Sequence, residues 1–496
     1  MMSSKTPPTL VQLARRSLLK DEALTISALQ HLPMELFPPL FKDAFNSKQH
    51  KILREMVAAW PFPCLPVGAL MTTPDLEILK TVLDGLDLLM TQKDQPRMWK
   101  LQVLDLRDAN HNFWNVWAGI WDGVCFPDIS QPQPLMYHPI QQGKQSLTIK
   151  INLSMNPGNI SEYNEYFYQW SMERKDVVQV NCQKIEIWTN PVYYSTYLQD
   201  VVELSSIQEL EVYKHCDLNT LAMIAPGLGQ MTNLQKLLLN DIHMSLEWLG
   251  NKKIEDWCVS MIIPQFSKLH KLQHLYLNDV CFVNKCLDQV LRSLESPLET
   301  LAITRCKLTE SHMSCLSECP RLHQLTHLDL SGTDFINSSY KFLGRLLGRL
   351  TATLQKLKLK GCMIVDFQIN VLLPALSRCS QLTEVDFQMN FLSMDILKKL
   401  LQHTANLRQL TRERYPAPYE VYDEFGNVLP QKFVQQCSEL MVTLNVIRQP
   451  KEICFVSNIC AGCGGFCVYK FGAILCLCWQ SERSLLDSEK GKPELK

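Results

Sequence analysis

The chain has 496 residues, of which 46% are hydrophobic and 20% charged, a composition typical of globular proteins and not of disordered chains. The 49 Lys and Arg residues nearly balance the 50 Asp and Glu residues, so a global electrostatic attraction to nucleic acid or anionic membranes is not expected. The start lacks the apolar core of a secretory signal, and the apolar stretch 453–479 is interrupted by Lys470, so no membrane span is expected. We therefore expect a cytoplasmic protein, with the nucleus as a second compartment, whose 19 cysteines are mostly thiols.

Residues 1–98 are predicted to form a helical N-terminal block. Thr9 and Gln12 have the spacing of a capping box, which predicts a helix beginning at Leu10. Apolar or small residues occupy one face of this helix, at Leu10, Leu13, Ala14 and Leu18. Further helices are expected over 21–32, from Leu32 onward, over 47–60 and over 74–90.

Residues 99–206 are predicted to contain degenerate leucine-rich repeats with an irregular insertion. Leu101, Leu104 and Leu106 fit the start of the pattern L-x-x-L-x-L-x-x-N/C-x-L. The alternating runs 147–153 and 177–188 predict strands. A separate small domain in this segment is the alternative.

Residues 207–420 are predicted to be regular leucine-rich repeats. Copies of the pattern begin at Leu298, Leu325, Leu354 and Leu382, and weaker copies begin at Ile207, Leu234, Leu272 and Leu407. All steps but one fall in the range of about 20–29 residues that such repeats have. The longer step, from Leu234 to Leu272, is explained by a polar insertion at 245–256 that loops out of the array.

Each copy should form a short strand followed by a helix, such as those expected over 366–379 and 395–404. The side chain at the Asn or Cys place should hydrogen-bond the backbone that leaves the strand. The predicted fold class is therefore α/β: a leucine-rich-repeat solenoid, or horseshoe, with a helical N-terminal cap that covers its first hydrophobic layer.

Alternate strand residues should line the concave face of the solenoid. The predicted partner-binding residues there are Glu209, Glu211, Tyr213, His274, Tyr276, Lys356, Lys358, Lys360, Glu384 and Asp386. Exposed aromatic side chains flanked by charge are typical of surfaces that bind proteins. A solvated face with no partner is the alternative.

Residues 421–480 are predicted to form a Cys-rich C-terminal cap, followed by a polar tail at 481–496. Cys460-x-x-Cys463-Gly464 has the form of a zinc knuckle, and Cys476-x-Cys478 completes a candidate four-cysteine metal site. The C-x-C half is less usual for zinc, and Cys454 and Cys467 are further candidates. The alternative is a buried Cys-rich strand that closes the solenoid without a cofactor.

The usual catalytic and nucleotide-binding motifs are absent: the sequence has no P-loop, G-x-G-x-x-G, H-E-x-x-H or G-x-S-x-G. The twelve histidines are dispersed, and His274 and His327 fall at strand positions. We therefore expect a protein that is not an enzyme.

Thr9–Leu18 resembles the elongin-C-binding box, S/T/P-L-x-x-x-C-x-x-x-hydrophobic, with Ala14 in the place of the cysteine. Leu32, Pro33 and Leu36 resemble the short box that contacts a cullin. In such helix-in-groove recognition, residues one and two turns apart form the binding stripe. The alternative is a helix that only caps the core.

Longer strings extend the resemblance. They are Leu10–Leu19, Asp21–Leu24, Leu36–Phe41, Ala59–Phe62, Val82–Asp87 and Trp99–Arg107. Together with the repeats and the Cys-rich tail, they resemble the PRAME family (preferentially expressed antigen in melanoma).

This resemblance implies a leucine-rich-repeat substrate receptor of a cullin-2 RING ubiquitin ligase, recruited through elongins B and C. It also implies germline or early-embryo expression, negative regulation of differentiation, apoptosis and transcription, and positive regulation of proliferation. A transcriptional corepressor or protein-binding scaffold without a ligase role is the alternative function. Direct nucleic-acid binding would need the lysines at 356–360 to outweigh their acidic neighbours, and nucleic acid is not an expected partner.

Overall fold

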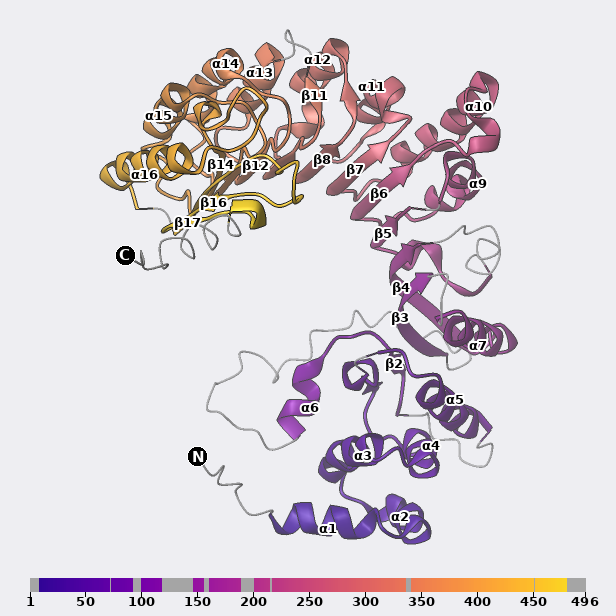
Figure 1. Ribbon diagram of the computed structural model, residues 1–496. Helices are drawn as coiled ribbons and strands as arrows, with labels where there is room; N and C mark the ends of the chain where they lie inside the picture. Colours follow the sequence, from indigo (N-terminus) through magenta and orange to yellow (C-terminus); the bar gives the residue numbers. More distant parts are fainter. Residues whose placement is uncertain are drawn as a thin grey trace, which may run out of the picture. The chain divides into compact units, whose positions relative to one another are not determined.

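The structure is a computed structural model that describes residues 9–71, 73–91, 100–117, 146–155, 160–188, 200–214, 216–335, 340–449 and 451–479. The predicted polar tail, 481–496, lies outside these residues. The chain divides into two compact units, Met1–Gln208 and Glu209–Lys496, and each is described by itself (Figure 1). The finer five-part division of the sequence stays a prediction.

The first part of the Met1–Gln208 unit is helical. Its elements are α1 (Leu10–Leu18), α2 (Glu22–Ala28), η1 (Leu29–His31), η2 (Met34–Leu36), α3 (Phe37–Asn46), α4 (His50–Ala58), η3 (Gly68–Leu70) and α5 (Leu76–Thr91). The predicted capping box is present, because Gln12 N donates to Thr9 Oγ1 at 3.2 Å and Thr9 N donates to Gln12 Oε1 at 3.0 Å. These bonds satisfy amides that the start of a helix leaves without intrahelical partners, so α1 begins at Leu10 as predicted.

Two of the predicted helices have different bounds in the structure. The helix expected over 21–32 ends at Ala28 and continues as the tighter turn η1. The helix expected over 47–60 begins at His50, because Lys48 has a φ of 53°. That left-handed conformation cannot continue a right-handed helix.

A parallel sheet follows the helices of this unit. It consists of β1 (Cys64–Leu65), β2 (Val103–Asp105), β3 (Leu147–Met155) and β4 (Val178–Ile187), with α6 (His111–Trp117) and α7 (Ile160–Glu173) between the later strands. The strands predicted at 147–153 and 177–188 are confirmed, and their side chains alternate between buried and partly exposed. Trp60 and Trp114 flank β1 by donating to the carbonyls of Cys64, at 3.0 Å, and Pro66, at 2.8 Å.

The Glu209–Lys496 unit repeats a strand and a helix along its length. Its parallel strands are β5 (Glu209–Val212), β6 (Lys236–Ile242), β7 (His274–Val280), β8 (Thr300–Thr304), β10 (His327–Asp329), β12 (Lys356–Lys358), β13 (Glu384–Asp386), β14 (Arg412–Pro416) and β15 (Glu452–Val456). Its helices are α9 (Leu218–Leu228), α10 (Lys252–Ile262), α11 (Val283–Ser293), α12 (Glu310–Glu318), α13 (Tyr340–Arg349), α14 (Asp366–Leu376), α15 (Met394–His403) and α16 (Pro430–Ile447). Figure 1 shows these helices along one side of the open sheet. The fold is therefore mixed α/β and solenoid-like.

The leucines of the repeat pattern lie between the sheet and the helices. Leu275, Leu301 and Leu357 are fully buried at equivalent strand positions. Burying each leucine side chain stabilises the fold by about 1.5–3 kcal/mol. In each repeat, two apolar residues separated by one outward-facing residue must both reach this core. An extended strand is the conformation that points alternate side chains to the same side.

The side chains at the Asn or Cys place hydrogen-bond backbone carbonyls of the preceding repeat, within its strand for Thr333 and just after its strand for Cys362 and Asn390. The bonds are Thr333 Oγ1 to Ile303 O at 3.0 Å, Cys362 Sγ to Leu330 O at 3.1 Å, and Asn390 Nδ2 to Leu359 O at 2.8 Å. The residue just before this place has a positive φ in six consecutive turns, at Asp241, Asp279, Arg305, Gly332, Gly361 and Met389. The left-handed conformation costs a non-glycine residue such as Met389 about 1–2 kcal/mol, which the buried hydrogen bonds of the following Asn390 offset.

The last predicted repeat begins three residues later than the sequence pattern suggested. A copy beginning at Leu407 would place Leu410 in the buried row of the sheet, but the register pairs Glu413 of β14 with the buried Val385 of β13. The copy therefore begins at Leu410. Glu413 occupies the position at which the other repeats have an apolar residue. Because a charged residue does not fit the leucine pattern, the repeat was placed in the wrong register.

The segment 245–256 is more ordered than the looping insertion that we expected. It contains η5 (Leu246–Trp248) and the first turn of α10. Asn251 caps α10 by accepting from Ile254 N at 3.4 Å, and Cys258 and Ile262 bury one face of the helix. The expectation of a loop is therefore wrong from Lys252 onward.

A small antiparallel hairpin follows the last parallel strand. Its strands are β16 (Val468–Tyr469) and β17 (Ala473–Ile474), and β16 pairs with β15. A separate two-stranded sheet is formed by β9 (Lys307–Leu308) and β11 (Asp334–Phe335). Across the described ranges, no helix has both the length and the apolar character that a bilayer-spanning helix requires.

Candidate protein-interaction surfaces and cysteine cluster

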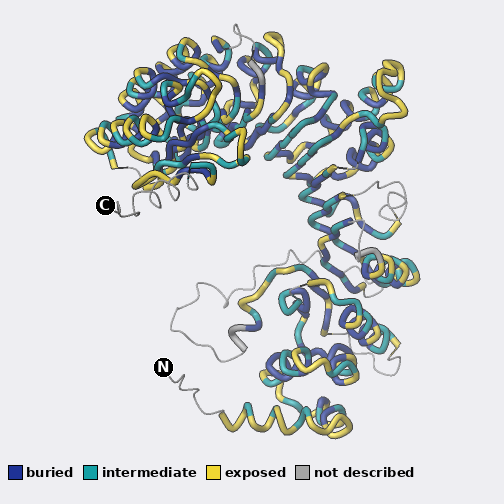
Figure 2. Tube along the Cα trace, viewed as in Figure 1, coloured by how far each residue is buried: buried dark blue, intermediate teal, exposed yellow. Residues whose placement is uncertain are grey.

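Helix α1 presents apolar side chains to solvent. Leu10 is 85% exposed, Leu13 and Ala14 are also exposed, and Leu18 is half-buried. No residue of this helix is buried, and Figure 2 shows it as a largely exposed segment. An exposed leucine at the free end of an amphipathic helix is a feature of helices that dock into a groove of a partner.

The opposite side and the C-terminal end of α1 are attached to its own unit. Arg15 Nε lies 3.3 Å from Asp43 Oδ2 of α3. Thr25 Oγ1 donates to the carbonyl of Leu18 at 2.6 Å, and Gln49 Nε2 donates to the carbonyl of Leu19 at 3.0 Å. These contacts orient the helix while the stripe formed by Leu10, Ala14 and Leu18 stays accessible.

The residues of the cullin-box-like segment follow α2. Leu32 and Leu36 are half-buried, and Pro33 is exposed. Pro33 precedes η2, and its carbonyl accepts from Leu36 N at 3.0 Å. The segment is thus a tight, ordered turn with an accessible proline.

The sheet face of the Glu209–Lys496 unit carries two rows of outward side chains, set by the parallel register. The first row is Glu209, Lys236, His274, Thr300, His327, Lys356, Glu384, Arg412 and Glu452. The second row is Glu211, Leu238, Tyr276, Ala302, Asp329, Lys358, Asp386, Arg414 and Cys454. The structure therefore brings nearly all of the predicted concave-face residues onto one face; Tyr213 and Lys360 lie just beyond β5 and β12.

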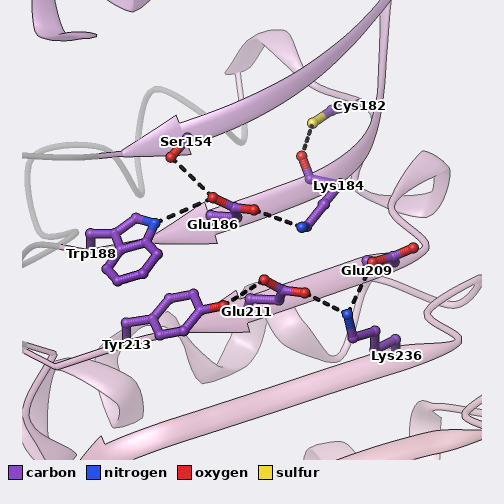
Figure 3. Close-up of polar contacts among 9 residues, drawn as sticks. All are labelled: Ser154, Cys182, Lys184, Glu186, Trp188, Glu209, Glu211, Tyr213 and Lys236. Atoms are coloured by element: carbon purple, nitrogen blue, oxygen red, sulfur yellow. Dashed lines mark hydrogen bonds and ion pairs between the residues drawn. The ribbon is translucent and has the colours of Figure 1, made fainter. Parts of the chain in front are cut away.

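The two carboxylates at the acidic end of this face share one lysine of the neighbouring strand (Figure 3). Lys236 Nζ lies 2.5 Å from Glu211 Oε1 and 3.4 Å from Glu209 Oε2. Tyr213 OH donates to Glu211 Oε2 at 2.7 Å, and the Lys236 ammonium lies 5.9 Å from the centroid of the Tyr276 ring. Glu211 is only 4% exposed, so it organises its neighbours and does not itself present a charge to a partner.

The other unit has a comparable internal arrangement on β3 and β4, also drawn in Figure 3. Glu186 pairs with Lys184 at 2.6 Å and accepts hydrogen bonds from Ser154 at 3.2 Å and Trp188 at 3.3 Å. The carboxylate is again paired within its own sheet.

Lys356, Lys358 and Lys360 form a lysine patch in the middle of the sheet face. Lys356 and Lys358 are half-buried and Lys360 is exposed. Within the described ranges, none of the three has an ion pair. The three lysines therefore outnumber Asp329 and Asp386, the acids that flank Lys358 on the neighbouring strands.

Two arginines that the sequence analysis missed lie beyond the lysine patch. Arg412 of β14 pairs with Glu452 at 3.2 Å and Glu384 at 3.7 Å, and Arg414 pairs with Asp386 at 3.7 Å. Glu384 and Asp386 are consequently 7% and 5% exposed, and burial raises the pKa of Asp386. If the repeat begins at Leu410, Arg412 and Arg414 alternate with inward-facing residues. This alternation would have predicted both arginines on the sheet face.

His327 lies beside the lysine patch in the first row. Burial lowers its pKa, and the positive charges of Lys356, His274 and Lys358 lower it further, against a smaller opposite effect of Glu384. Its Nδ1 lies 2.7 Å from Thr326 Oγ1. Neutral His327 therefore limits the positive charge of the patch near neutral pH.

The predicted metal-site cysteines lie together at the C-terminal end. The Sγ atoms of Cys460, Cys463, Cys476 and Cys478 all lie within 4.8 Å of one another. Hydrogen bonds from the backbone amides of Cys478 and Gly465 lower the pKa of Cys463 to about 6. The four side chains form a group that could hold a thiophilic metal ion.

The two further cysteine candidates lie outside this group. Cys467 is fully buried, and its Sγ accepts from Cys476 N at 3.3 Å. Cys454 lies in the second row of the sheet face, where Gln388 Nε2 is 3.8 Å from its Sγ. The structure therefore separates a set of four thiols from two structural cysteines.

The chain matches two family models, the PRAME N-terminal domain over residues 7–114 and the PRAME C-terminal domain over residues 147–478. PRAME family member 12 of Homo sapiens is 44% identical over 464 residues, covering 93% of this chain and 95% of the relative. PRAME family member 20 of Homo sapiens is 43% identical over 478 residues, covering 96% of this chain and all of the relative. These names state family membership and no reaction.

A solved crystal structure of a Bacteroides fragilis protein aligns with 53% of this chain and 66% of that protein. Its TM-score is 0.26 at 13% sequence identity, which is too low to support an argument.

Proposed function

Because the chain belongs to the PRAME family, we propose that it is a substrate-recognition adaptor of a cullin-2 RING ubiquitin ligase, recruited through elongins B and C. The adaptor performs no chemistry of its own. It holds a target protein near the ubiquitin-conjugating enzyme and thereby raises the effective concentration of the target's lysines. The observation that carries the proposal is the exposed apolar stripe of α1.

The stripe of α1 has the spacing that a helix-in-groove contact with elongin C requires. Leu10, Ala14 and Leu18 follow one another at intervals of one helical turn, and Leu10 is 85% exposed at the free end. Burying the Leu10 side chain in a pocket would contribute about 1.5–3 kcal/mol to binding. Ala14 replaces the cysteine of the box with another small side chain, which keeps room for the approach of the partner.

The cullin-2 contact is proposed for Leu32, Pro33 and Leu36. Their turn follows α2 and η1, so it belongs to the same helical part as α1. Pro33 is accessible and conformationally restricted, which lowers the entropy lost when a partner orders the segment.

The target is proposed to bind the sheet face of the Glu209–Lys496 unit, which we interpret as a leucine-rich-repeat horseshoe. The buried leucines and the strand-turn side chains support that interpretation. The lysine patch favours an acidic segment of the target, because Glu384 and Asp386 on one side of it are already paired with Arg412 and Arg414, and Asp329 is the acid that borders Lys358 on the other side. Nucleic acid is not proposed as a partner, since those acids limit the basic surface to one patch.

The proposed setting is the cytoplasm and the nucleus. The proposed consequences are those that the family resemblance implies: reduced differentiation, apoptosis and transcription of targets, and sustained proliferation. A transcriptional corepressor or scaffold that uses the sheet face alone remains the second candidate.

The proposal is tested by assembling the purified full-length chain with elongins B and C and then with cullin-2, monitored by size-exclusion chromatography. Leu10→Asp should abolish both steps, whereas Pro33→Asp should retain the elongins and lose cullin-2. Leu246→Asp is the matched control, because Leu246 is 89% exposed and lies in the other unit. A wild-type chain that binds neither partner would contradict the adaptor function and favour the scaffold.

A further inference from the structure

We propose that Cys460, Cys463, Cys476 and Cys478 bind one zinc ion as a closed four-thiolate structural site. The proposal concerns the C-terminal end of the second unit and is independent of the ligase function. The sequence alone left open whether these cysteines form a metal site or a buried strand. The structure separates them from the buried Cys467 and Cys454 and places their sulfurs together.

The spacing of the sulfur atoms fits tetrahedral zinc. Zinc–thiolate bonds of about 2.3 Å in a tetrahedron place the sulfurs about 3.8 Å apart. Cys460 Sγ and Cys478 Sγ lie 3.8 Å apart, and all four sulfurs lie within 4.8 Å of one another. A disulfide would need about 2.05 Å between two of them, and all four cysteines are free thiols.

The backbone around the first cysteine pair has the shape of a metal-binding knuckle. Cys460 N donates to Gly465 O at 2.7 Å, and Gly464 N donates to Cys460 O at 2.9 Å. Gly464 has a φ of +67°, which favours glycine. A Cβ at Gly462 would lie 3.1 Å from Cys478 Sγ, so the absent side chain lets the two cysteine pairs approach.

The sequence order of the ligands indicates what the ion does. Cys460 and Cys463 precede the hairpin β16–β17, and Cys476 and Cys478 follow it. One ion on all four thiolates closes the ends of the hairpin, whose strand β16 pairs with the last parallel strand β15. Four protein ligands leave no open position for substrate or water, so the site is structural and protects the edge of the sheet.

The experiment measures zinc in the full-length chain purified under reducing conditions without added metal. We expect about one equivalent of zinc, as for closed structural sites, and less than about a fifth of an equivalent in Cys463→Ser and in Cys478→Ser. Cys315→Ser is the control, because Cys315 is a half-buried thiol on α12 far along the chain from the cluster, and it should retain the zinc. Less than about a tenth of an equivalent in the reduced wild type, even after incubation with zinc, would overturn the proposal.

A second measurement uses only the wild-type protein, so it remains informative if the cysteine variants fail to fold. Wild-type protein stripped of zinc is titrated with Co²⁺, and thiolate-to-cobalt charge transfer with the visible bands of tetrahedral Co²⁺ is expected. An octahedral spectrum, or no uptake of Co²⁺, would count against the four-thiolate site. Hydrogen exchange in β15 and in 468–474 should become faster after zinc removal, and unchanged exchange would refute the role of the ion in closing the sheet edge.

Discussion

Arg448→Leu should strongly destabilise the C-terminal part of the second unit. Glu413 is 0% exposed, in a row of strand positions otherwise occupied by leucine, valine or isoleucine. Arg448 Nη2 and Nε donate to its two carboxylate oxygens at 2.5 and 3.0 Å, and Tyr415 OH donates at 2.7 Å. Burial raises the pKa of Tyr415 well above its ordinary value, so its hydroxyl remains a donor.

The magnitude follows from what Arg448→Leu leaves behind. The two charge-assisted hydrogen bonds to Glu413 are lost, each contributing about 1.5–3 kcal/mol, together with the bonds to Leu401 O and Thr404 Oγ1, and a carboxylate without its cation stays in the core. We therefore expect a loss of about 3–5 kcal/mol in the free energy of unfolding, as for other broken buried pairs. Arg412→Leu is the matched control on the exposed face and should cost no more than about 1 kcal/mol.

The double substitution Glu413→Leu with Arg448→Leu separates the charge from the packing. It places the repeat's usual residue at position 413 and should recover part of the loss, because no buried charge remains, whereas Tyr415 OH still loses its acceptor. The assay is urea unfolding of the full chain, with hydrogen exchange of 412–416 and 440–449 as a local readout. A single variant as stable as wild type, or a double variant no better than the single, would refute the reasoning.

Three further predictions concern the strand turns, the lysine patch and His327. Asn390→Ala should lower the free energy of unfolding by about 3 kcal/mol in urea titrations, because its amide bonds two backbone carbonyls and accepts from two backbone amides in the core. Charge reversal of Lys356, Lys358 and Lys360 together should weaken capture of an acidic target while the melting temperature stays within a few degrees; unchanged binding with unchanged melting would exclude that face. Because the pKa of His327 is lowered in the folded state, the unfolded chain binds more protons below about pH 6.5, so stability should fall as the pH drops from 7.5 to 5.5. His327→Asn should reduce that difference in melting temperature, and an identical pH dependence in the variant would exclude the contribution of His327.

The parts of the fold that follow from periodic apolar contacts were predictable from the sequence. Leucine spacing located the strands around Leu301, Leu328, Leu357 and Val385, because each must bury the same inward position. Hydrogen bonds between residues close in sequence were also predictable, as in the capping box formed by Thr9 and Gln12.

The missed features depend on tertiary partners that no local pattern reveals. Glu413 breaks the leucine pattern, and its burial is explained only by Arg448, which lies beyond α16. Arg412 and Arg414 were overlooked as face residues because the repeat was placed at Leu407 and not at Leu410. The ordered turn before α10 depends on the capping side chain of Asn251, within a segment whose polarity suggested a loop.

In the candidate sites too, the sequence pattern predicted which residues belong together, whereas their burial and contacts depend on the fold. The sequence grouped Cys460, Cys463, Cys476 and Cys478 by motif, and the fold alone shows that their sulfurs converge. The sequence pattern also predicted Glu211 and Asp386 as exposed charges, whereas both are buried beside neighbouring cations. Burial of a charge depends on the next strand, which is distant in sequence.

The most direct test of the adaptor function is the affinity of the full-length chain for elongins B and C, measured by titration for wild type, Leu10→Asp and Ala14→Cys. We expect wild type to bind, Leu10→Asp to bind at least about tenfold more weakly, and Ala14→Cys, which restores the residue of the box, to bind at least as tightly as wild type. Equal binding by wild type and Leu10→Asp, or no binding by wild type and Ala14→Cys alike, would show that α1 is not the docking helix.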